Sequence, residues 1–110
     1  MYRLVNMSDR MNEYKRDLKR LAICSPSRAR RLIRQGDDDF ILAILDAVWK
    51  TLAGNVSLSP AQREQVRIVQ PALRRFASRG QSVEERRRVI ATRKGIRAIQ
   101  TVFDVLQTSF

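Results

Sequence analysis

The chain has 110 residues, of which 22 are basic and 11 acidic, so its formal net charge at pH 7 is +11. Hydrophobic residues make up 44%, which argues against wholesale disorder, and this length suits one domain. A single cysteine excludes an internal disulfide framework and fits a reducing compartment, and no apolar run reaches the roughly 18–20 residues of a membrane span.

The first third of the chain shows helical spacing of apolar residues. After a capping residue, Asn6 or Ser8, five side chains fall on one face of a first helix: Met11, Tyr14, Leu18, Leu21 and Ala22. A second helix is expected to begin at Ser25, because a proline follows in the first helical position, and to end at Gly36. Both stretches predict short helices that each bury one face.

Residues 40–49 are apolar on nearly every side of a helix and follow three consecutive aspartates. Acidic side chains are favourable at a helix N-terminus, so residues 37–39 are expected to cap this helix. A metal site is the alternative, but adjacent aspartates lack the ligand spacing of a calcium loop, and we predict no metal. The segment predicts a central apolar helix over about residues 38–53, with Trp49 in the core.

The second half of the chain predicts further helices. Ser59 is followed by a proline and begins one of them, and Pro71 inside it predicts a kink or break near Gln70. Ser82 with Glu85 three residues later is a capping box, which predicts a short helix. The last helix carries a regular apolar stripe: Ile96, Ile99, Phe103, Leu106 and Phe110. We expect this helix to complete the core; a partner interface and a membrane-surface role are the alternatives.

These elements predict an all-α fold. We expect a single helical domain over residues 1–110, a compact bundle of five to six short helices around the central one, with the first few residues flexible. An enzyme is not expected, because the chain has no histidine, its lone cysteine has no activating partner, and no glycine-rich phosphate loop occurs. No cofactor is predicted.

The basic residues fall in two blocks. Residues 1–35 carry 10 basic and 3 acidic side chains, residues 61–110 carry 11 and 4, and the segment between them is net acidic. Most are arginines, which pair bidentately with phosphate. We predict polyanion contacts by three clusters: Arg28, Arg30, Arg31 and Arg34; Arg74, Arg75 and Arg79; and Arg86, Arg87, Arg88, Arg93, Lys94 and Arg97. A charged surface without a partner is the alternative.

The charge pattern favours nucleic acid as the partner. Aromatic residues do not interleave with the clusters, so contact with a duplex backbone is expected rather than stacking on single strands. We predict salt-dependent, sequence-independent binding of double-stranded DNA by an intracellular protein of the nucleus or a virion. Charge alone does not separate DNA from RNA.

A protein–protein module is the alternative function. A helical adaptor similar to a death fold would assemble by placing its basic faces on an acidic partner or on the acidic segment at residues 37–39 of another copy. One continuous basic face favours DNA, whereas separate acidic and basic faces favour such assembly.

Residues 52–62 (LAGNVSLSPAQ) are followed by residues 72–77 (ALRRFA), and residues 82–90 (SVEERRRVI) lead into the apolar C-terminus. Over about residues 25–107, the chain thereby resembles small basic proteins of Polinton/Maverick and adintovirus-like DNA elements of animals. In that family a GNV-L-S/T-x-x-Q turn, an LR-L helix and a serine-led basic run precede an apolar tail. The resemblance implies a core protein that condenses a genome in an adenovirus-type virion.

The chain departs from that family pattern at two places. Family tails carry a double glycine and a proline-broken apolar run, whereas here only Gly95 is present and the tail is a regular amphipathic helix. Glu84 and Glu85 also dilute the basic run. Both departures favour a folded domain over a disordered condensing peptide.

Overall fold

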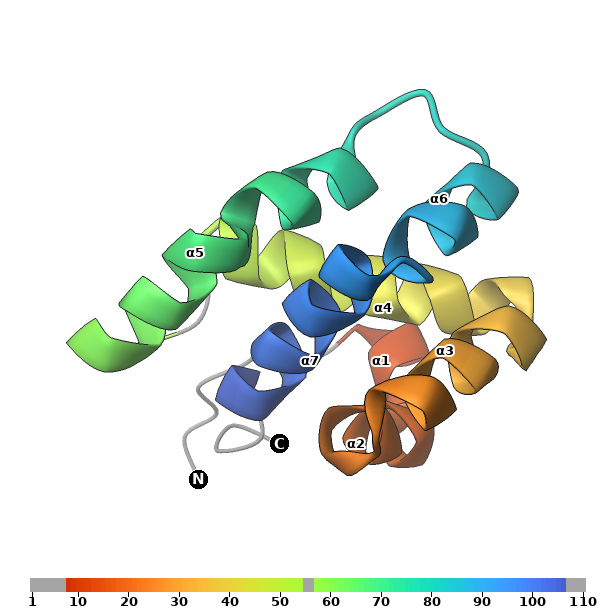
Figure 1. Ribbon diagram of the computed structural model, residues 1–110, viewed down its shortest axis with the longest axis horizontal. Helices are drawn as coiled ribbons and strands as arrows, with labels where there is room; N and C mark the ends of the chain where they lie inside the picture. The colour runs from red at the N-terminus through yellow and green to blue at the C-terminus, as the bar shows by residue number, and fades with distance from the viewer. Residues whose placement is uncertain (1–7, 55–56, 107–110) are drawn as a thin grey trace.

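Seven helices make up most of residues 8–54 and 57–106, the part of the chain that the computed structural model describes (Figure 1). They are α1 (Asp9–Glu13), α2 (Lys15–Ile23), α3 (Pro26–Gln35), α4 (Asp38–Leu52), α5 (Pro60–Ala77), α6 (Val83–Ile90) and α7 (Arg93–Leu106). These described residues contain no strand, so the all-α fold is confirmed. The expectations for the first few residues, for Asn6 and for Phe110 concern positions outside the described ranges.

The predicted first helix is two helices, divided at Tyr14. Ser8 caps α1, since its hydroxyl oxygen accepts a hydrogen bond from the Met11 N–H at 3.1 Å. At Tyr14 the backbone leaves the helix (φ −101°, ψ 16°), and the phenol donates to both carboxylate oxygens of Asp37 at 2.9 Å. The apolar spacing does not reveal the division, because the partner that holds Tyr14 lies 23 residues further along the chain.

The predicted central helix is α4, which contacts α1, α5, α6 and α7. The Asp37 carboxylate accepts a hydrogen bond from the Phe40 N–H at 2.9 Å, which confirms that this aspartate caps the helix. Seven side chains of α4 are buried: Phe40, Ile41, Ala43, Ile44, Ala47, Val48 and Thr51. They form the middle of the apolar core.

Trp49 does not lie in the core, and the prediction that it does is wrong: 43% of the residue is exposed. It shares one stripe of α4 with Leu42 and Leu45, which are half-buried. Neighbouring helices cover the other sides of α4 and leave this stripe partly open. A uniformly apolar segment indicates burial of the helix as a whole, but only the neighbours decide which side stays in contact with water.

α5 continues through Pro71, so the break predicted near Gln70 does not occur. An interior proline removes one backbone hydrogen bond and costs a helix about 3 kcal/mol. Four large side chains of α5 are buried: Val66, Val69, Leu73 and Phe76. At about 1.5–3 kcal/mol each, their burial outweighs the cost of the proline.

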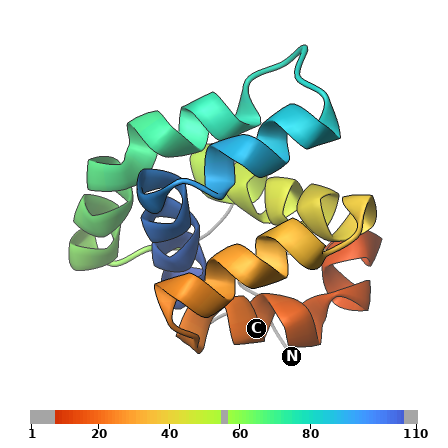
Figure 2. The same cartoon turned by 45° about the vertical axis from the view of Figure 1, so that its right-hand side comes forward.

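α7 lies between α5 on one side and α2 and α3 on the other (Figures 1 and 2). Its stripe is buried over Ile96, Ile99, Phe103 and Leu106, which confirms that the helix completes the core. At Gly95 the helix touches the end of α6 so closely that a Cβ atom would lie 2.3 Å from the Val89 carbonyl oxygen. Among the described helices, none is long and apolar enough to cross a membrane.

The two aromatic residues Phe76 and Trp49 should differ in their effect on stability. Phe76 is fully buried, so we expect Phe76→Ala to lower the free energy of unfolding by about 3–5 kcal/mol. Trp49→Ala should lower the free energy of unfolding by less, because nearly half of that residue already contacts water. Urea unfolding followed by circular dichroism measures both. Equal losses would contradict the position of Trp49.

The Tyr14 phenol should ionise at a higher pH than an ordinary tyrosine. Its hydrogen bond to Asp37, assisted by burial and nearby carboxylates, raises its pKa from 10.0 to about 12. The folded state therefore favours the neutral phenol, a contribution to stability that is complete below pH 10 and lost as the pH rises through about 12. We expect Tyr14→Phe to lose less stability over that range than the parent chain. In a Tyr2→Phe background, phenolate absorbance isolates Tyr14, and ionisation near pH 10 would contradict the bond.

Candidate nucleic-acid interface

Arg86 is a buried arginine that caps α5. Only 9% of the residue is exposed, and its Nη1 donates a hydrogen bond to the Phe76 carbonyl oxygen at 2.6 Å. Carbonyl groups near a helix C-terminus lack partners within the helix and carry partial negative charge. The structure therefore places this predicted phosphate contact inside the fold, where its guanidinium satisfies a backbone acceptor.

Arg87 joins three helices. Its Nη1 donates to the carbonyl oxygens of Ile33, at 2.7 Å, and Gly36, at the end of α3. Its Nη2 donates to the Asp38 carboxylate at 3.0 Å, at the start of α4, and its Nε lies 3.8 Å from a Glu84 oxygen. Only 13% of the side chain is exposed. These contacts occupy the guanidinium, and of the run 86–88 they leave Arg88 as the exposed arginine.

Arg30 has both a structural contact and a solvent-facing edge. Its Nε donates to the Ala91 carbonyl oxygen at 2.9 Å, which connects α3 to the turn between α6 and α7. The residue is half-buried and lines two surface grooves. It therefore helps to hold the turn in place and contributes charge at the surface.

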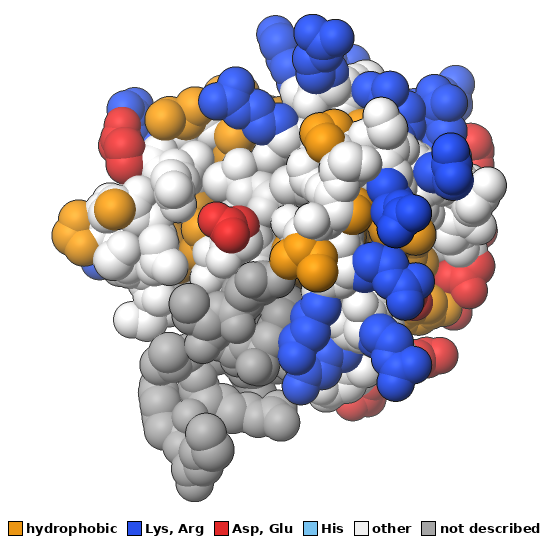
Figure 3. Space-filling model, turned by 60° about the horizontal axis from the view of Figure 1, so that its bottom comes forward, with side chains coloured by type: hydrophobic (Ala, Val, Ile, Leu, Met, Phe, Trp, Pro, Cys, Tyr) orange, Lys and Arg blue, Asp and Glu red, His pale blue; other side chains and the backbone are white. Residues whose placement is uncertain are grey.

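The other predicted contacts are all exposed: Arg28, Arg31, Arg34, Arg74, Arg75, Arg79, Arg88, Arg93, Lys94 and Arg97. Within the described part of the chain, none of them has a carboxylate within 4.0 Å; the ion pairs there involve Arg10, Arg67 and Arg87. Figure 3 shows Lys and Arg side chains gathered over the top and right of one face. Acidic side chains of the described part therefore leave this positive charge unpaired.

A tight turn positions the basic residues at the start of α7. The Thr92 hydroxyl donates to the Val89 carbonyl oxygen at 2.8 Å, and its oxygen accepts from the Gly95 N–H at 3.1 Å. Together with the close packing at Gly95, these bonds hold α6 and α7 in one arrangement. Arg88 and Arg93 flank the turn, so their backbone positions are determined by it.

Four neighbouring grooves around this turn share residues and bring parts of all three predicted clusters together. One of their cations, Arg87, is already engaged by Asp38 and backbone carbonyl oxygens. We call the other seven the α7 basic surface: Arg30, Arg34, Arg75, Arg88, Arg93, Lys94 and Arg97. They come from α3, α5, α6 and α7. Five predicted contacts do not line these grooves: the exposed Arg28, Arg31, Arg74 and Arg79, and the buried Arg86.

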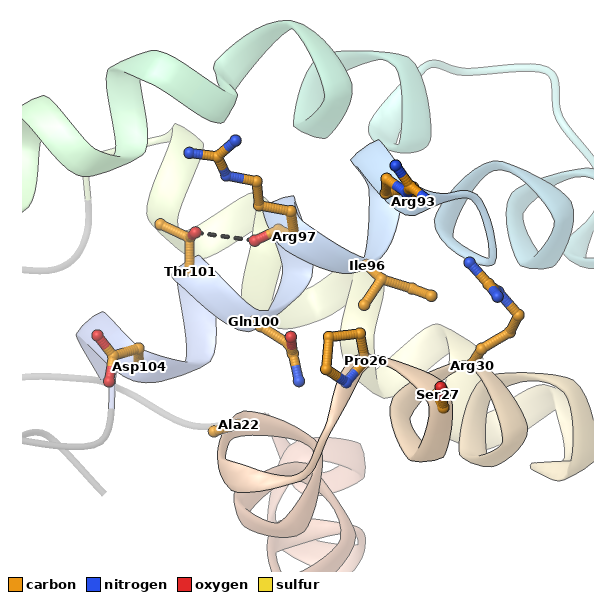
Figure 4. Close-up of a pocket in the computed structure, with 10 residues that line it drawn as sticks. All are labelled: Ala22, Pro26, Ser27, Arg30, Arg93, Ile96, Arg97, Gln100, Thr101 and Asp104. Atoms are coloured by element: carbon orange, nitrogen blue, oxygen red, sulfur yellow. Dashed lines mark hydrogen bonds between the residues drawn. The ribbon is translucent and has the colours of Figure 1, made fainter.

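One groove, of about 600 Å³, separates α7 from the junction of α2 and α3 (Figure 4). Ile96 and Pro26 face each other across it, and Arg30 and Arg93 lie at one end. Gln100 closes the α2 side, since its Nε2 donates to the carbonyl oxygens of Leu21 and Cys24 at 3.2 and 2.9 Å. Arg97 extends away from Pro26, so it borders the grooves on both sides of α7.

The structure adds basic residues that we did not predict as contacts. Arg16, Lys19 and Arg20 are exposed on α2, which packs against α7. Their spacing of i, i+3 and i+4 is the available signal, because it places them on one polar face of a helix. They are diluted in the sequence by Asp17, which hides the cluster from a count of consecutive charges.

The chain matches no family model, no curated protein and no solved structure. Within the described residues, no group of three cysteine, aspartate or glutamate side chains is arranged to hold a metal ion. The function is therefore inferred from the chain's own residues.

Substitutions of the three consecutive arginines, Arg86, Arg87 and Arg88, should differ in their effect on stability. Arg86→Met removes this donor from the Phe76 carbonyl oxygen, and Arg87→Met removes a donor from the Ile33 carbonyl oxygen in α3. Each substitution should therefore lower the free energy of unfolding by about 1–3 kcal/mol. Arg88→Met changes an exposed side chain and should alter the free energy of unfolding by no more than about 0.5 kcal/mol. Urea midpoints measure all three. Identical midpoints would show that the two capping roles are wrong.

Proposed function

We propose that this chain binds double-stranded DNA, independently of base sequence, through the α7 basic surface. The observation that supports this most is the convergence of seven cations from four helices on connected grooves. Among described residues, only two acidic side chains line those grooves: Glu84, beside Arg87, and Asp104, at the end of one groove remote from Arg93. Phosphate is the ligand group that such a surface suits best.

The position of the aromatic residues favours a duplex over a single strand. Phe40, Phe76 and Phe103 are buried, and Tyr14 is half-buried and bonded to Asp37. The exposed aromatic residue in the described part is Trp49, which lines none of the four grooves. Among the described residues, no base-stacking platform therefore accompanies the α7 basic surface, and contacts to backbone phosphates are favoured.

The acidic segment at residues 37–39 is less suited to assembly between copies. Asp37 accepts hydrogen bonds from Tyr14 and from the Phe40 N–H, and Asp38 accepts one from Arg87. Arg87 offsets the charge of Asp38, and the two neutral donors occupy acceptor positions of Asp37 that a basic partner would need. These contacts favour DNA over the alternative of a self-assembling adaptor.

We further propose that the binding serves packaging of a viral or mobile-element genome, in the nucleus or a virion. The resemblance to Polinton-type basic proteins supports a role in genome packaging. Part of the resembling pattern builds structure: the Ser59 N–H donates to Gln62 Oε1 at 2.9 Å, and the Gln62 N–H donates back to Ser59 Oγ at 3.2 Å. Binding, rather than catalysis, is proposed because the chain lacks histidine and no cluster of reactive groups accompanies the arginines.

A pair of double variants tests the surface. Arg88→Gln with Arg93→Gln removes two exposed charges beside the turn, and should reduce the slope of log affinity against log salt by up to about 1.8 units for duplex DNA. Lys50→Gln with Arg63→Gln removes the same charge outside the grooves and should change the slope little. Fluorescence anisotropy with two unrelated duplexes measures both. Equal slopes for the two variants would reject this surface, and a loss with only one duplex would reject sequence independence.

A further inference from the structure

A groove between α5 and the α6–α7 junction combines apolar and basic residues. It consists of two hollows, of about 290 and 710 Å³, that share Pro71, Ala72 and Lys94, and we call it the α5–α7 groove. Its apolar residues are Ile68, Val69, Pro71, Ala72 and Val89. Its charged residues are Arg75, Arg88, Arg93, Lys94 and Arg97, and among described residues none of its lining is acidic.

Ile68 is the unexplained residue of this groove. It is 61% exposed, although it lies one position from the buried Val69. A single exposed isoleucine is common on protein surfaces. This one, however, lines a hollow together with a proline and an alanine, with two cations at its margin. A DNA backbone offers phosphates and sugar edges here, not an apolar side chain that would cover an isoleucine, so the proposed DNA contact gives no account of it.

We propose that the α5–α7 groove binds an acidic amphipathic helix of a partner protein. An apolar side chain of that helix would cover Ile68, Pro71 and Ala72, while carboxylates on its flanks meet Arg75, Lys94 and Arg97. A helix is the suitable partner element, because the described residues form no sheet edge to which a strand could pair. The proposal does not require DNA binding.

Two other occupants suit the groove less well. A membrane presents a flat surface, whereas this site is concave, so lipid would not fill the hollow beside Ile68. A second copy of the chain has no fully uncovered acidic helix among its described residues. The apolar sides of α1 and α2 are buried in the core, and the stripe of α4 that carries Leu42, Leu45 and Trp49 is only partly open.

The partner's basic contacts would exclude DNA locally. Arg75, Lys94 and Arg97 line the α5–α7 groove and also belong to the α7 basic surface. If the proposed DNA binding holds, an acidic helix and a duplex compete for these cations, and the helix would act as a release factor.

The probe for the test is a synthetic peptide of about four helical turns, with leucines along one stripe and glutamates elsewhere. A scrambled peptide of identical composition has no stripe and serves as its control. Fluorescence anisotropy at about 0.15 M salt should show tighter binding of the striped peptide. Ile68→Ser should weaken it about tenfold, equivalent to about 1.4 kcal/mol. Ile23→Ser, at a 76% exposed residue of α2 outside the groove, should leave it unchanged.

Several results would overturn the proposal. They are no binding of the striped peptide, equal binding of the scrambled one, or equal effects of the two serine variants. Loss of self-association in Ile68→Ser, measured by light scattering over a concentration series, would assign the groove to a second copy. Ile68-dependent binding of phosphatidylserine vesicles, without peptide binding, would assign it to lipid.

The same variants separate this proposal from DNA binding. Ile68→Ser keeps every basic residue, so its duplex affinity should equal that of the parent chain, and its thermal midpoint should confirm that it folds. A parent chain that binds no duplex would refute the proposed function while leaving the peptide result interpretable. Loss of duplex affinity in a folded Ile68→Ser would instead show that the groove serves DNA.

Discussion

The close contact between α6 and α7 is the constraint on which the rest of the structure depends. At Gly95 the two backbones approach to a distance that leaves no space for a side chain, and the Thr92 hydroxyl bonds on both sides of the turn. This contact directs α7 into the space between α5 and α2, where its apolar face completes the core. It also brings Arg88 and Arg93 to the junction of the surface grooves.

The arginines divide into two physical classes that composition does not distinguish. Arg30, Arg86 and Arg87 donate to backbone carbonyl oxygens at helix ends or in a turn, and these hydrogen bonds connect α3, α5, α6 and the turn after α6. The other arginines predicted as contacts are exposed and lack acidic partners in the described part of the chain. An arginine suits both roles because its planar group offers several donors and keeps its charge at any cellular pH.

The proposed functions place charge on a rigid support. A disordered basic peptide would lose conformational entropy each time it bound DNA, whereas the helices here hold their cations in place beforehand. The same rigidity produces a concave site, the α5–α7 groove, which a flexible chain would not maintain. A folded basic domain of this kind could therefore offer the same cations to a DNA backbone and, through the concave shape of the groove, to one partner helix.

The sequence by itself determined the helices, most of their caps and the buried stripes, because these depend on residues three or four positions apart. Ser25, Ser59 and Ser82 each cap the helix that they were predicted to begin, and the α7 stripe is buried. Only the tertiary structure decided the division at Tyr14, the exposure of Trp49 and the burial of Arg86. Each of these depends on a neighbour distant in sequence: Asp37 for Tyr14, the helices around α4 for Trp49, and the carbonyl oxygen of Phe76 for Arg86. The spacing of residues along one helix carries no information about such neighbours. It therefore cannot distinguish an arginine that caps another helix from one that is exposed at the surface.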